Sequence, residues 1–234
     1  MQEYFSKLGE RLYDVFIKGG RYMYIVNGLG NTILITVFAL VIGVIIGVAI
    51  ALVRVSYANN RNKFMRIPNA VCGLYLTVIR GTPMVVQLMI MYFVILKSAG
   101  PLVVAVISFG LNSAAYVAEV IRSGIQSVDK GQTEAGRSLG LTQAQTLFSI
   151  VIPQAFRNVA PAIFNEFISL LKETSVAGYV GIHDLTKGGE IIRSITYDSF
   201  PPLILVASVY LIMVIGLTRI LTVIEGRFAK SGTR

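Results

Sequence analysis

The sequence is poor in the residues from which reactive centres are usually built. Its 234 residues include one cysteine, one histidine and no tryptophan. A lone Cys72 excludes a disulfide framework within the chain and a cysteine-ligated metal site. A lone His183 leaves little material for zinc binding or for histidine-based catalysis. We therefore expect no catalytic residue, no metal and no cofactor in this chain.

Charged residues are also scarce. They form 14% of the chain, whereas an average globular sequence contains about 25%. Apolar residues form 54% and the mean hydropathy is +0.69, which excludes a disordered or fibrous chain and indicates a protein of the lipid bilayer. In such a protein the net charge of +9 reflects the orientation of the loops, so it does not point to a nucleic-acid partner.

The gaps between charged residues locate the membrane spans. They predict five transmembrane helices, at about residues 22–53, 64–96, 98–126, 150–180 and 200–224. The second stretch suits one long or broken helix better than two complete spans. An odd number of crossings places the termini on opposite sides of the membrane. More Lys and Arg residues fall on the inner side if the N-terminus is outside and the C-terminus is cytoplasmic, and we predict that orientation.

The membrane domain is expected at residues 21–228. Residues 1–20 carry apolar side chains at helical spacing between charges, which predicts an amphipathic helix on the outer membrane surface. A docking helix for a partner is the alternative. Residues 182–199 are polar and are expected outside, with His183 in solvent. Residues 229–234 are expected to form a cytoplasmic tail.

A polar loop at about residues 129–153 is expected on the cytoplasmic side. Its start has the pattern of a short helix, with Thr133 as a cap, Glu134 in the first turn and a stop at Leu139-Gly140. The small residues Ala135 and Gly136 would leave a surface that another protein can clasp. On physical grounds alone, an ordinary connector is the favoured explanation of the loop.

This loop resembles the EAA motif of ABC-importer permeases. The residues that match the motif at its spacing are Glu134-Ala135-Gly136, Gly140 and Ile150-Val151-Ile152-Pro153. Gly136 and Ile152 depart from the Ala and Leu of the motif. Two further blocks are similar to the polar amino-acid branch of the family, namely Ile79-Arg80-Gly81-Thr82-Pro83 with Gln87 nearby, and Asn165-Glu166 followed by Lys172-Glu173-Thr174-Ser175.

The resemblance implies an all-α integral membrane protein with the type I ABC importer fold, five transmembrane helices and a cytoplasmic coupling helix. It implies a permease subunit for polar or basic L-amino acids in the cell membrane. The partners would be two ATP-binding subunits, a second permease subunit, identical or homologous, and an extracytoplasmic amino-acid-binding protein. The ATP-binding subunits would be contacted by Glu134, Ala135, Gly136 and Gly140. Because the chain has no Walker A sequence, it should hydrolyse nothing alone.

Two other functions remain open from the sequence. An ion-coupled secondary transporter for small polar solutes would also need charges and a broken helix in the membrane. A membrane scaffold subunit without transport activity would use the same charges as packing pairs. The EAA-like loop and the lack of an internal repeat favour the importer over the secondary transporter.

Arg80 is a charge placed against the hydrophobic trend. It lies midway between Lys63 and Lys97, the ends of its long apolar stretch, and so near mid-membrane, where an ionised side chain costs about 2.5–3.5 kcal/mol. The Gly81-Thr82-Pro83 sequence predicts a helix break, with Thr82 as cap and Pro83 at the first position of a half-helix. Such breaks hold anionic groups in transporters. We expect the α-carboxylate of an amino acid to be received by Arg80, Thr82, Pro83 and Gln87. Alternatively, Arg80 pairs with a membrane acid and only stabilises the fold.

A polar stripe marks the fourth predicted span. Asn165, Ser169 and Lys172 follow helical spacing, and Glu166 lies beside them, so this face must meet a cavity or another helix. Glu166 is the candidate to receive an ammonium group, either the α-amino group of the ligand or a cationic side chain, with Asn165 and Ser169 as hydrogen-bonding neighbours. Interhelical hydrogen bonds that pack the helices are the alternative.

Two features of the first and third predicted spans have plainer explanations. Glu119 stands three residues before Arg122, so an ion pair within one helix is favoured, although Glu119 remains a candidate to border the substrate. Gly43 and Gly47 form a GxxxG pattern that would suit close packing against another helix, but this spacing is common in such helices.

Overall fold

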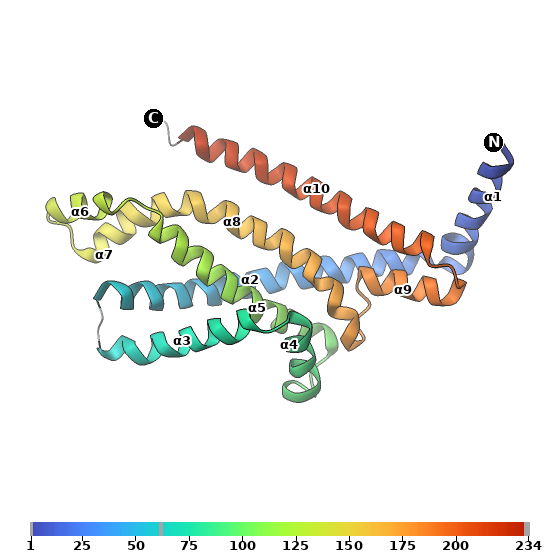
Figure 1. Cartoon of the computed structure of the whole chain (residues 1–234), viewed down its shortest axis with the longest axis horizontal. Helices are drawn as coiled ribbons and strands as arrows, with labels where there is room; N and C mark the ends of the chain where they lie inside the picture. Colours follow the sequence, from blue (N-terminus) through green and yellow to red (C-terminus); the bar gives the residue numbers. More distant parts are fainter. Residues whose placement is uncertain (1, 61–62, 232–234) are drawn as a thin grey trace.

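The computed structural model describes residues 2–60 and 63–231, which fold into long helices joined by short turns (Figure 1). The elements in chain order are α1 (Gln2–Leu12), the turns η1 (Tyr13–Ile17) and η2 (Lys18–Gly20), α2 (Tyr22–Asn60), α3 (Lys63–Gly81), α4 (Met84–Ile90), η3 (Met91–Ile95), α5 (Pro101–Gln126), α6 (Lys130–Ser138), α7 (Gln143–Thr146), η4 (Leu147–Val151), α8 (Ile152–Glu173), η5 (Thr174–Val180), α9 (Leu185–Thr196) and α10 (Phe200–Ser231).

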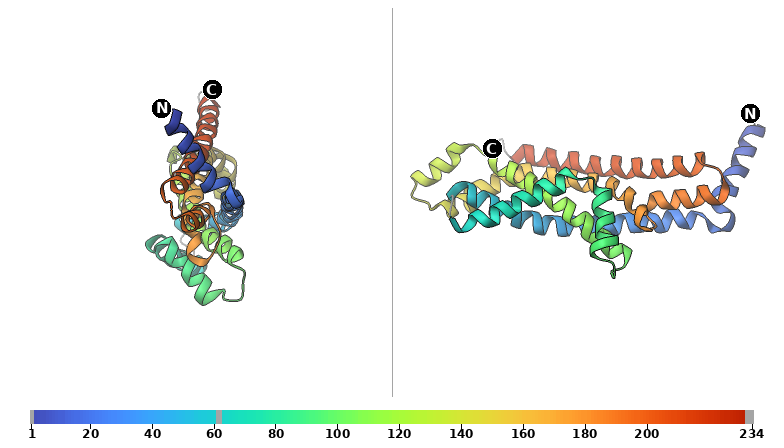
Figure 2. Two further views of the ribbon diagram at one scale, coloured as in Figure 1. Left: turned by 90° about the vertical axis from the view of Figure 1, so that its right-hand side faces the viewer. Right: turned by 60° about the horizontal axis from the view of Figure 1, so that its bottom comes forward.

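The five predicted spans are confirmed. Within residues 2–60 and 63–231, four segments are long and apolar enough to cross a membrane, at Tyr22–Ala58, Pro101–Gln126, Gln143–Val180 and Phe200–Gly226. A fifth span is the pair Lys63–Gly81 and Met84–Ile95, which is bent by 110°. The two ends of the chain lie toward opposite ends of the long axis. Helices α6 and α7 lie at the end where α10 finishes, whereas α1 and α9 lie at the other end (Figures 1 and 2).

Helix α2 is packed against α5 at a crossing lined by small residues. A Cβ atom on Gly43 would lie 2.8 Å from the Ser113 hydroxyl, and one on Gly47 would lie 2.8 Å from a Val117 methyl group. On the α5 side, a Cβ atom on Gly110 would lie 2.8 Å from a methyl group of Ile42. The GxxxG pattern therefore does mark close helix packing here, because glycine allows the two backbones to approach.

Helix α9 was not predicted, because its segment looks like a polar loop. Its apolar side buries Leu185 and Ile192. Asp184 caps the helix by accepting hydrogen bonds from the backbone N–H groups of Thr186 (2.9 Å) and Lys187 (3.2 Å). A Cβ atom on Gly28 of α2 would lie 2.5 Å from the Asp184 carbonyl oxygen, so α2 and α9 touch through their backbones.

The N-terminal segment is tied to the turn between α9 and α10. Arg11 donates two hydrogen bonds to the Asp198 carboxylate, at 2.7 and 2.9 Å. Val15 is buried in an apolar cluster with residues of α2, α9 and α10, namely Ile25, Leu185, Ile192 and Val206. Helix α1 ends at Leu12, and its placement on the outer membrane surface stays a prediction. At the other end of the chain, α10 continues to Ser231, so residues 229–231 extend the last helix, and residues 232–234 lie outside the described part.

Candidate functional site

The bend between α3 and α4 is the break predicted at Gly81-Thr82-Pro83, but its capping differs. Pro83 occupies the N-cap position with φ −64° and ψ 137°, one place before the predicted first helical position. Thr82 does not cap α4, because its hydroxyl donates back to the Val78 carbonyl oxygen at 2.8 Å. Threonine hydroxyls in a helix often donate in this way to the carbonyl oxygen of the preceding turn.

Gln87 closes this bend. In an uninterrupted helix the Ile79 carbonyl oxygen would accept a hydrogen bond from the N–H of residue 83, but proline has none. The Gln87 side-chain nitrogen takes its place and lies 2.7 Å from the Ile79 carbonyl oxygen. The same nitrogen lies 3.0 Å from the Thr82 carbonyl oxygen and 2.8 Å from the Thr82 hydroxyl. The side-chain nitrogen of Gln87 is thus hydrogen-bonded to the backbone of the bend.

Asn112 of α5 completes the network and was not among the predicted residues. It is 3% exposed, and its side-chain nitrogen donates to the Gln87 side-chain oxygen at 3.1 Å. A single amide within an apolar span is the signal that could have found it, because a buried polar group in a membrane protein needs a partner.

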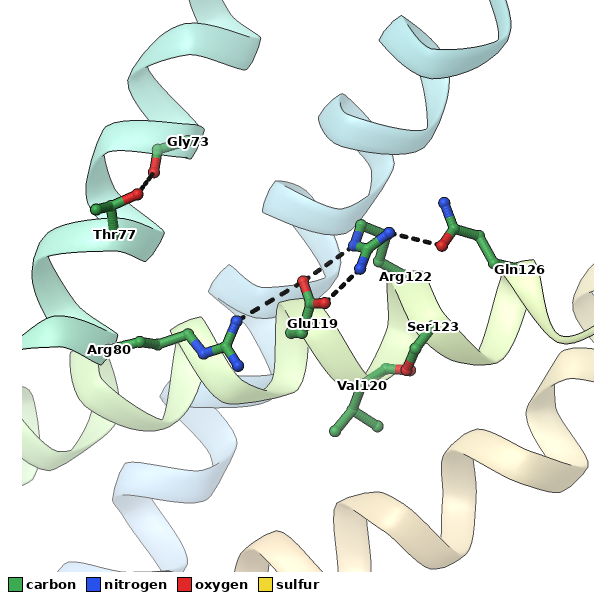
Figure 3. Close-up of polar contacts among 8 residues, drawn as sticks. All are labelled: Gly73, Thr77, Arg80, Glu119, Val120, Arg122, Ser123 and Gln126. Atoms are coloured by element: carbon green, nitrogen blue, oxygen red, sulfur yellow. Dashed lines mark hydrogen bonds and ion pairs between the residues drawn. The ribbon is translucent and has the colours of Figure 1, made fainter.

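Arg80 points from α3 towards a group of charges on α5 (Figure 3). One of its nitrogens lies 4.0 Å from the Glu119 carboxylate, and its guanidinium carbon lies 5.6 Å from the centre of the Tyr116 ring. Glu119 also accepts two hydrogen bonds from Arg122, so the predicted ion pair within α5 is confirmed. Arg122 donates further to Gln126 at 2.6 Å. Arg80 is therefore only loosely held by the acid that Arg122 binds closely.

Arg54 of α2 is a further residue of this group that the sequence did not reveal. A cavity of about 500 Å³ is lined by Arg54, Gly73, Leu76, Thr77, Arg80, Gly81 and Glu119. Gly73 makes room for the Arg54 side chain, since a Cβ atom there would lie 3.1 Å from an Arg54 nitrogen. Two arginines face one carboxylate across the cavity, and Arg122 stands behind that carboxylate. The local surplus of positive charge suits an anionic group.

A larger cavity of about 910 Å³ lies on the side of α6 and α7. Arg54 lines both cavities, and Arg122, Asn69, Lys130 and Thr133 are among the other residues that line the larger one. Because they share a wall, Arg54 stands between the cavity at the bend and the end of the molecule that carries α6.

Glu166 meets α5 on another side. It accepts a hydrogen bond from the buried Ser113 hydroxyl at 3.0 Å, which is the interhelical contact weighed as its alternative role. Asn165 is exposed, and Ser169 is half-buried. Ser113 and Glu119 are six positions apart on α5, so they project about 120° apart and about 9 Å along the helix. The two halves of the predicted site therefore contact different faces of α5.

The expected coupling loop contains two short helices. Helix α6 begins one turn earlier than predicted, because Asp129 and not Thr133 caps it, with its carboxylate accepting from the Gly131 N–H at 2.6 Å. Its end is as predicted, because Gly140 adopts a φ of +83°, a conformation that glycine favours. Thr142 and Gln145 then form a capping box at the start of α7.

The exposed surface of this loop differs from the predicted one. Gly136 is buried against its own chain, since a Cβ atom there would lie 2.9 Å from both Ile150 and Thr146, so it cannot share an exposed surface with Ala135. Glu134 and Ala135 are exposed, and Leu139 is 81% exposed at the end of α6.

A bent span, a basic cavity beside it and a short polar helix pair at one end define a multi-pass membrane transport component. Residues 43–230 match the family described as the binding-protein-dependent transport system inner membrane component. The chain belongs to this family, whose members are transport permeases and not enzymes. Family membership implies partners that bind ATP.

Relatives cover almost the whole chain. The chain is 36% identical over 230 residues to the putative glutamine transport system permease protein GlnP of Rickettsia bellii, covering 94% of this chain and 100% of the relative. It is 37% identical over 206 residues to the arginine transport system permease protein ArtQ of Bacillus subtilis, covering 86% and 91%. A chain from the crystal structure of an amino acid ABC transporter with histidines is 39% identical, with a TM-score of 0.82 and coverage of 91% and 98%.

A fourth likeness concerns the fold alone. A chain of the inward-facing methionine ABC transporter MetNI superimposes with a TM-score of 0.68 at 20% identity, covering 88% of this chain and 98% of the other.

Proposed function

We propose that this chain is the permease subunit of an ABC importer that takes up polar or basic L-amino acids. The single observation that carries the proposal is Arg80, which stands at the bend of a membrane span in a cavity with a surplus of positive charge. The names of the similar permeases, which mention glutamine and arginine, support the substrate class. The N-terminus lies outside and the C-terminus in the cytoplasm, so that α6 faces the cytoplasm.

In this proposal Arg80 binds the α-carboxylate of the substrate. An arginine can hold a carboxylate through two parallel hydrogen bonds, and the 4.0 Å contact with Glu119 leaves its donors available. Thr82, Pro83 and Gln87 shape the bend that presents Arg80. Glu119 borders the substrate. On α8, Glu166 with Asn165 and Ser169 receives a cationic group of the substrate, either the α-ammonium group or a cationic side chain, once the second permease subunit completes the pathway.

The transport cycle is driven from the cytoplasmic loop. Two ATP-binding subunits contact α6, where Glu134 and Ala135 are exposed and Gly140 ends the helix, while Gly136 anchors α6 to η4. Closure of the ATP-binding subunits rotates the attached helices as rigid bodies and exposes the cavity to the two sides in turn. A binding protein delivers the amino acid from outside.

The experiment is equilibrium binding of radiolabelled L-glutamine and L-arginine to the permease–ATPase complex in nanodiscs, without the binding protein. Arg80→Ala should weaken binding roughly ten- to hundredfold, because a hydrogen-bonded charge contributes about 1.5–3 kcal/mol. The matched control is Arg219→Ala, which removes an exposed arginine from the last span. Wild-type affinity in an assembled Arg80→Ala complex would overturn the proposal.

Glu166→Gln tests the other half of the site in the same assay. This substitution keeps an oxygen that can accept from Ser113 but removes the charge. Binding of L-arginine should weaken more than binding of L-glutamine, because only arginine carries a second cation. Equal effects on the two amino acids would count against a direct contact with the substrate side chain.

A further inference from the structure

The bend that presents Arg80 depends on hydrogen bonds from one side chain. The backbone carbonyl oxygens of Ile79 and Thr82 both point at the Gln87 side-chain nitrogen. Proline at position 83 removes the N–H that would otherwise satisfy Ile79. The geometry of the α3–α4 junction therefore depends on the position and orientation of the Gln87 amide.

The orientation of that amide is determined by its neighbours. Carbonyl oxygens only accept hydrogen bonds, so the end of Gln87 that faces Ile79 and Thr82 must be the NH₂ group. Its oxygen then faces α5 and needs a donor. Asn112 supplies the donor at 3.1 Å and is 3% exposed, so solvent has little access to replace it.

Asn112 shares one face of α5 with the residues that contact Arg80. Asn112, Tyr116 and Glu119 follow i, i+4, i+7 spacing, which aligns them along one side of a helix. Tyr116 lies beneath the Arg80 guanidinium, and Glu119 lies at its edge. One face of α5 thus holds the bend, through Gln87, and the guanidinium that the bend presents.

We propose that Asn112 is a positioning residue for Arg80. It acts through Gln87, and it fixes the distance between the bend and the charged end of the α5 face. The proposal rests on the proposed function, in which Arg80 binds the substrate carboxylate. Loss of Asn112 lets the Gln87 amide turn and the bend shift, so that Arg80 no longer meets the carboxylate in its best geometry.

The test is a double-mutant cycle in the nanodisc binding assay. Asn112→Leu keeps the size of the side chain and removes the donor, and it should weaken binding of L-glutamine and L-arginine roughly three- to tenfold. In an Arg80→Ala background the same change should have little further effect, because the two residues act on one interaction. Binding of the α-amides of the two amino acids, which lack the carboxylate, should be nearly insensitive to Asn112→Leu.

A second variant and a control keep the test decisive. Gln87→Leu removes the same network from the less buried side of the contact and should reproduce the Asn112→Leu pattern. Asn158→Leu, which breaks the contact of Asn158 with Ser127 near the start of α8, should leave binding unchanged.

The two possible failures are distinguishable. An Arg80→Ala complex with normal affinity would overturn the proposed function and the positioning role together. A large effect of Arg80→Ala combined with no effect of Asn112→Leu and Gln87→Leu would overturn the positioning role alone. The positioning role would also be overturned if the affinity losses from Asn112→Leu and Gln87→Leu added to the loss from Arg80→Ala. The same conclusion would follow if these variants weakened binding of the α-amides as much as binding of the amino acids.

Discussion

Two regions of the molecule differ in how closely their helices pack. The first, which we call the frame, consists of α2, α5 and α9, whose backbones approach each other at glycines such as Gly28, Gly43 and Gly47. The second, which we call the arm, consists of α3, α4 and η3, and exposes large apolar side chains along α3, including Phe64 at 89%. The arm is attached to α2 and α5 through buried apolar side chains, including Leu76 and Leu88, and through the polar contacts of Gln87 and Arg80, whereas the frame is close-packed.

The close-packed region and the region that carries the binding charge are therefore different parts of the molecule. Arg80 belongs to the arm, whereas the groups that hold it belong to the frame. Helix α5 serves both regions with two faces: Gly110, Ser113 and Val117 contact α2, whereas Asn112, Tyr116 and Glu119 face the arm. An element that exposes much of its apolar surface and carries the binding charge can shift against a close-packed support during transport, and hinge motions in proteins use such elements.

The largest expected effect comes from disturbing the frame. Gly28→Ala places a methyl group 2.5 Å from the Asp184 carbonyl oxygen, and neither backbone can move away easily. We expect a loss of about 1–3 kcal/mol of stability, the usual cost of overpacking, and a melting temperature lower by roughly 3–10 °C. Thermal unfolding of the purified complex in detergent measures it.

The matched control for this change lies two residues away on the same helix. Gly30 is exposed, and a Cβ atom there would meet nothing within 4 Å, so Gly30→Ala should be neutral or slightly stabilising. If both variants melt at the wild-type temperature, the contact between α2 and α9 is not the rigid one that defines the frame.

Sequence patterns predicted the spans of both regions, because charges interrupt apolar runs at their ends. They failed on α9, because Gly188 and Gly189 interrupt its apolar spacing and made the segment look like a loop. Those glycines are required by the close packing, since a Cβ atom on Gly188 would meet the backbone of Tyr24. The packing of one helix against another decides such positions, and one sequence alone does not reveal it.

The sequence predicted only part of the candidate site, and the missing part again depends on contacts between helices. Arg80 and the break stand out because a charge and a proline oppose the local trend. The sequence shows that Pro83 leaves the Ile79 carbonyl oxygen without its usual N–H donor. It does not show which side chain supplies the replacement donor, because that side chain could come from any part of the chain. Arg54 comes from a different helix and reaches the cavity across Gly73. Contacts between distant segments of this kind depend on the fold.

A smaller effect should come from the ion pair between Arg80 of the arm and Glu119 of the frame. Glu119 competes with the substrate carboxylate for Arg80, and half-exposed ion pairs contribute about 0.2–1 kcal/mol. Glu119→Gln should therefore tighten binding of L-glutamine roughly one- to fivefold, with the melting temperature nearly unchanged. The nanodisc binding assay measures the affinity.

The sign of the Glu119→Gln effect discriminates between two roles. A weaker affinity would mean that Glu119 binds the ammonium group of the substrate instead of competing with its carboxylate. Glu225→Gln, a neutralised exposed carboxylate near the end of α10, serves as the control and should leave substrate binding unchanged.

The smallest effect is expected where the N-terminal segment is tied to the turn that follows α9. The hydrogen bonds from Arg11 lower the pKa of Asp198, so the carboxylate is harder to protonate in the folded protein than in an unfolded chain. A lowered pKa means that the ion pair contributes fully above the ordinary Asp pKa of about 3.9 and is lost as the pH falls through the lower, folded value. Residues 2–20 should therefore resist limited proteolysis equally from pH 8 to 5 and become more accessible only below about pH 4.

Asp198→Asn separates this ion pair from other effects of acid. The variant should be cleaved somewhat faster than wild type at pH 7, and its cleavage should lose the acid-dependent increase, while Asp14→Asn should keep it because Asp14 pairs with Lys18 and not with the turn before α10. Loosening of the wild type between pH 8 and 5 would contradict the assignment. The effect stays small because Val15 remains buried among Ile25, Leu185 and Val206 when the ion pair opens, so the segment stays anchored to the frame by an apolar contact that pH does not change.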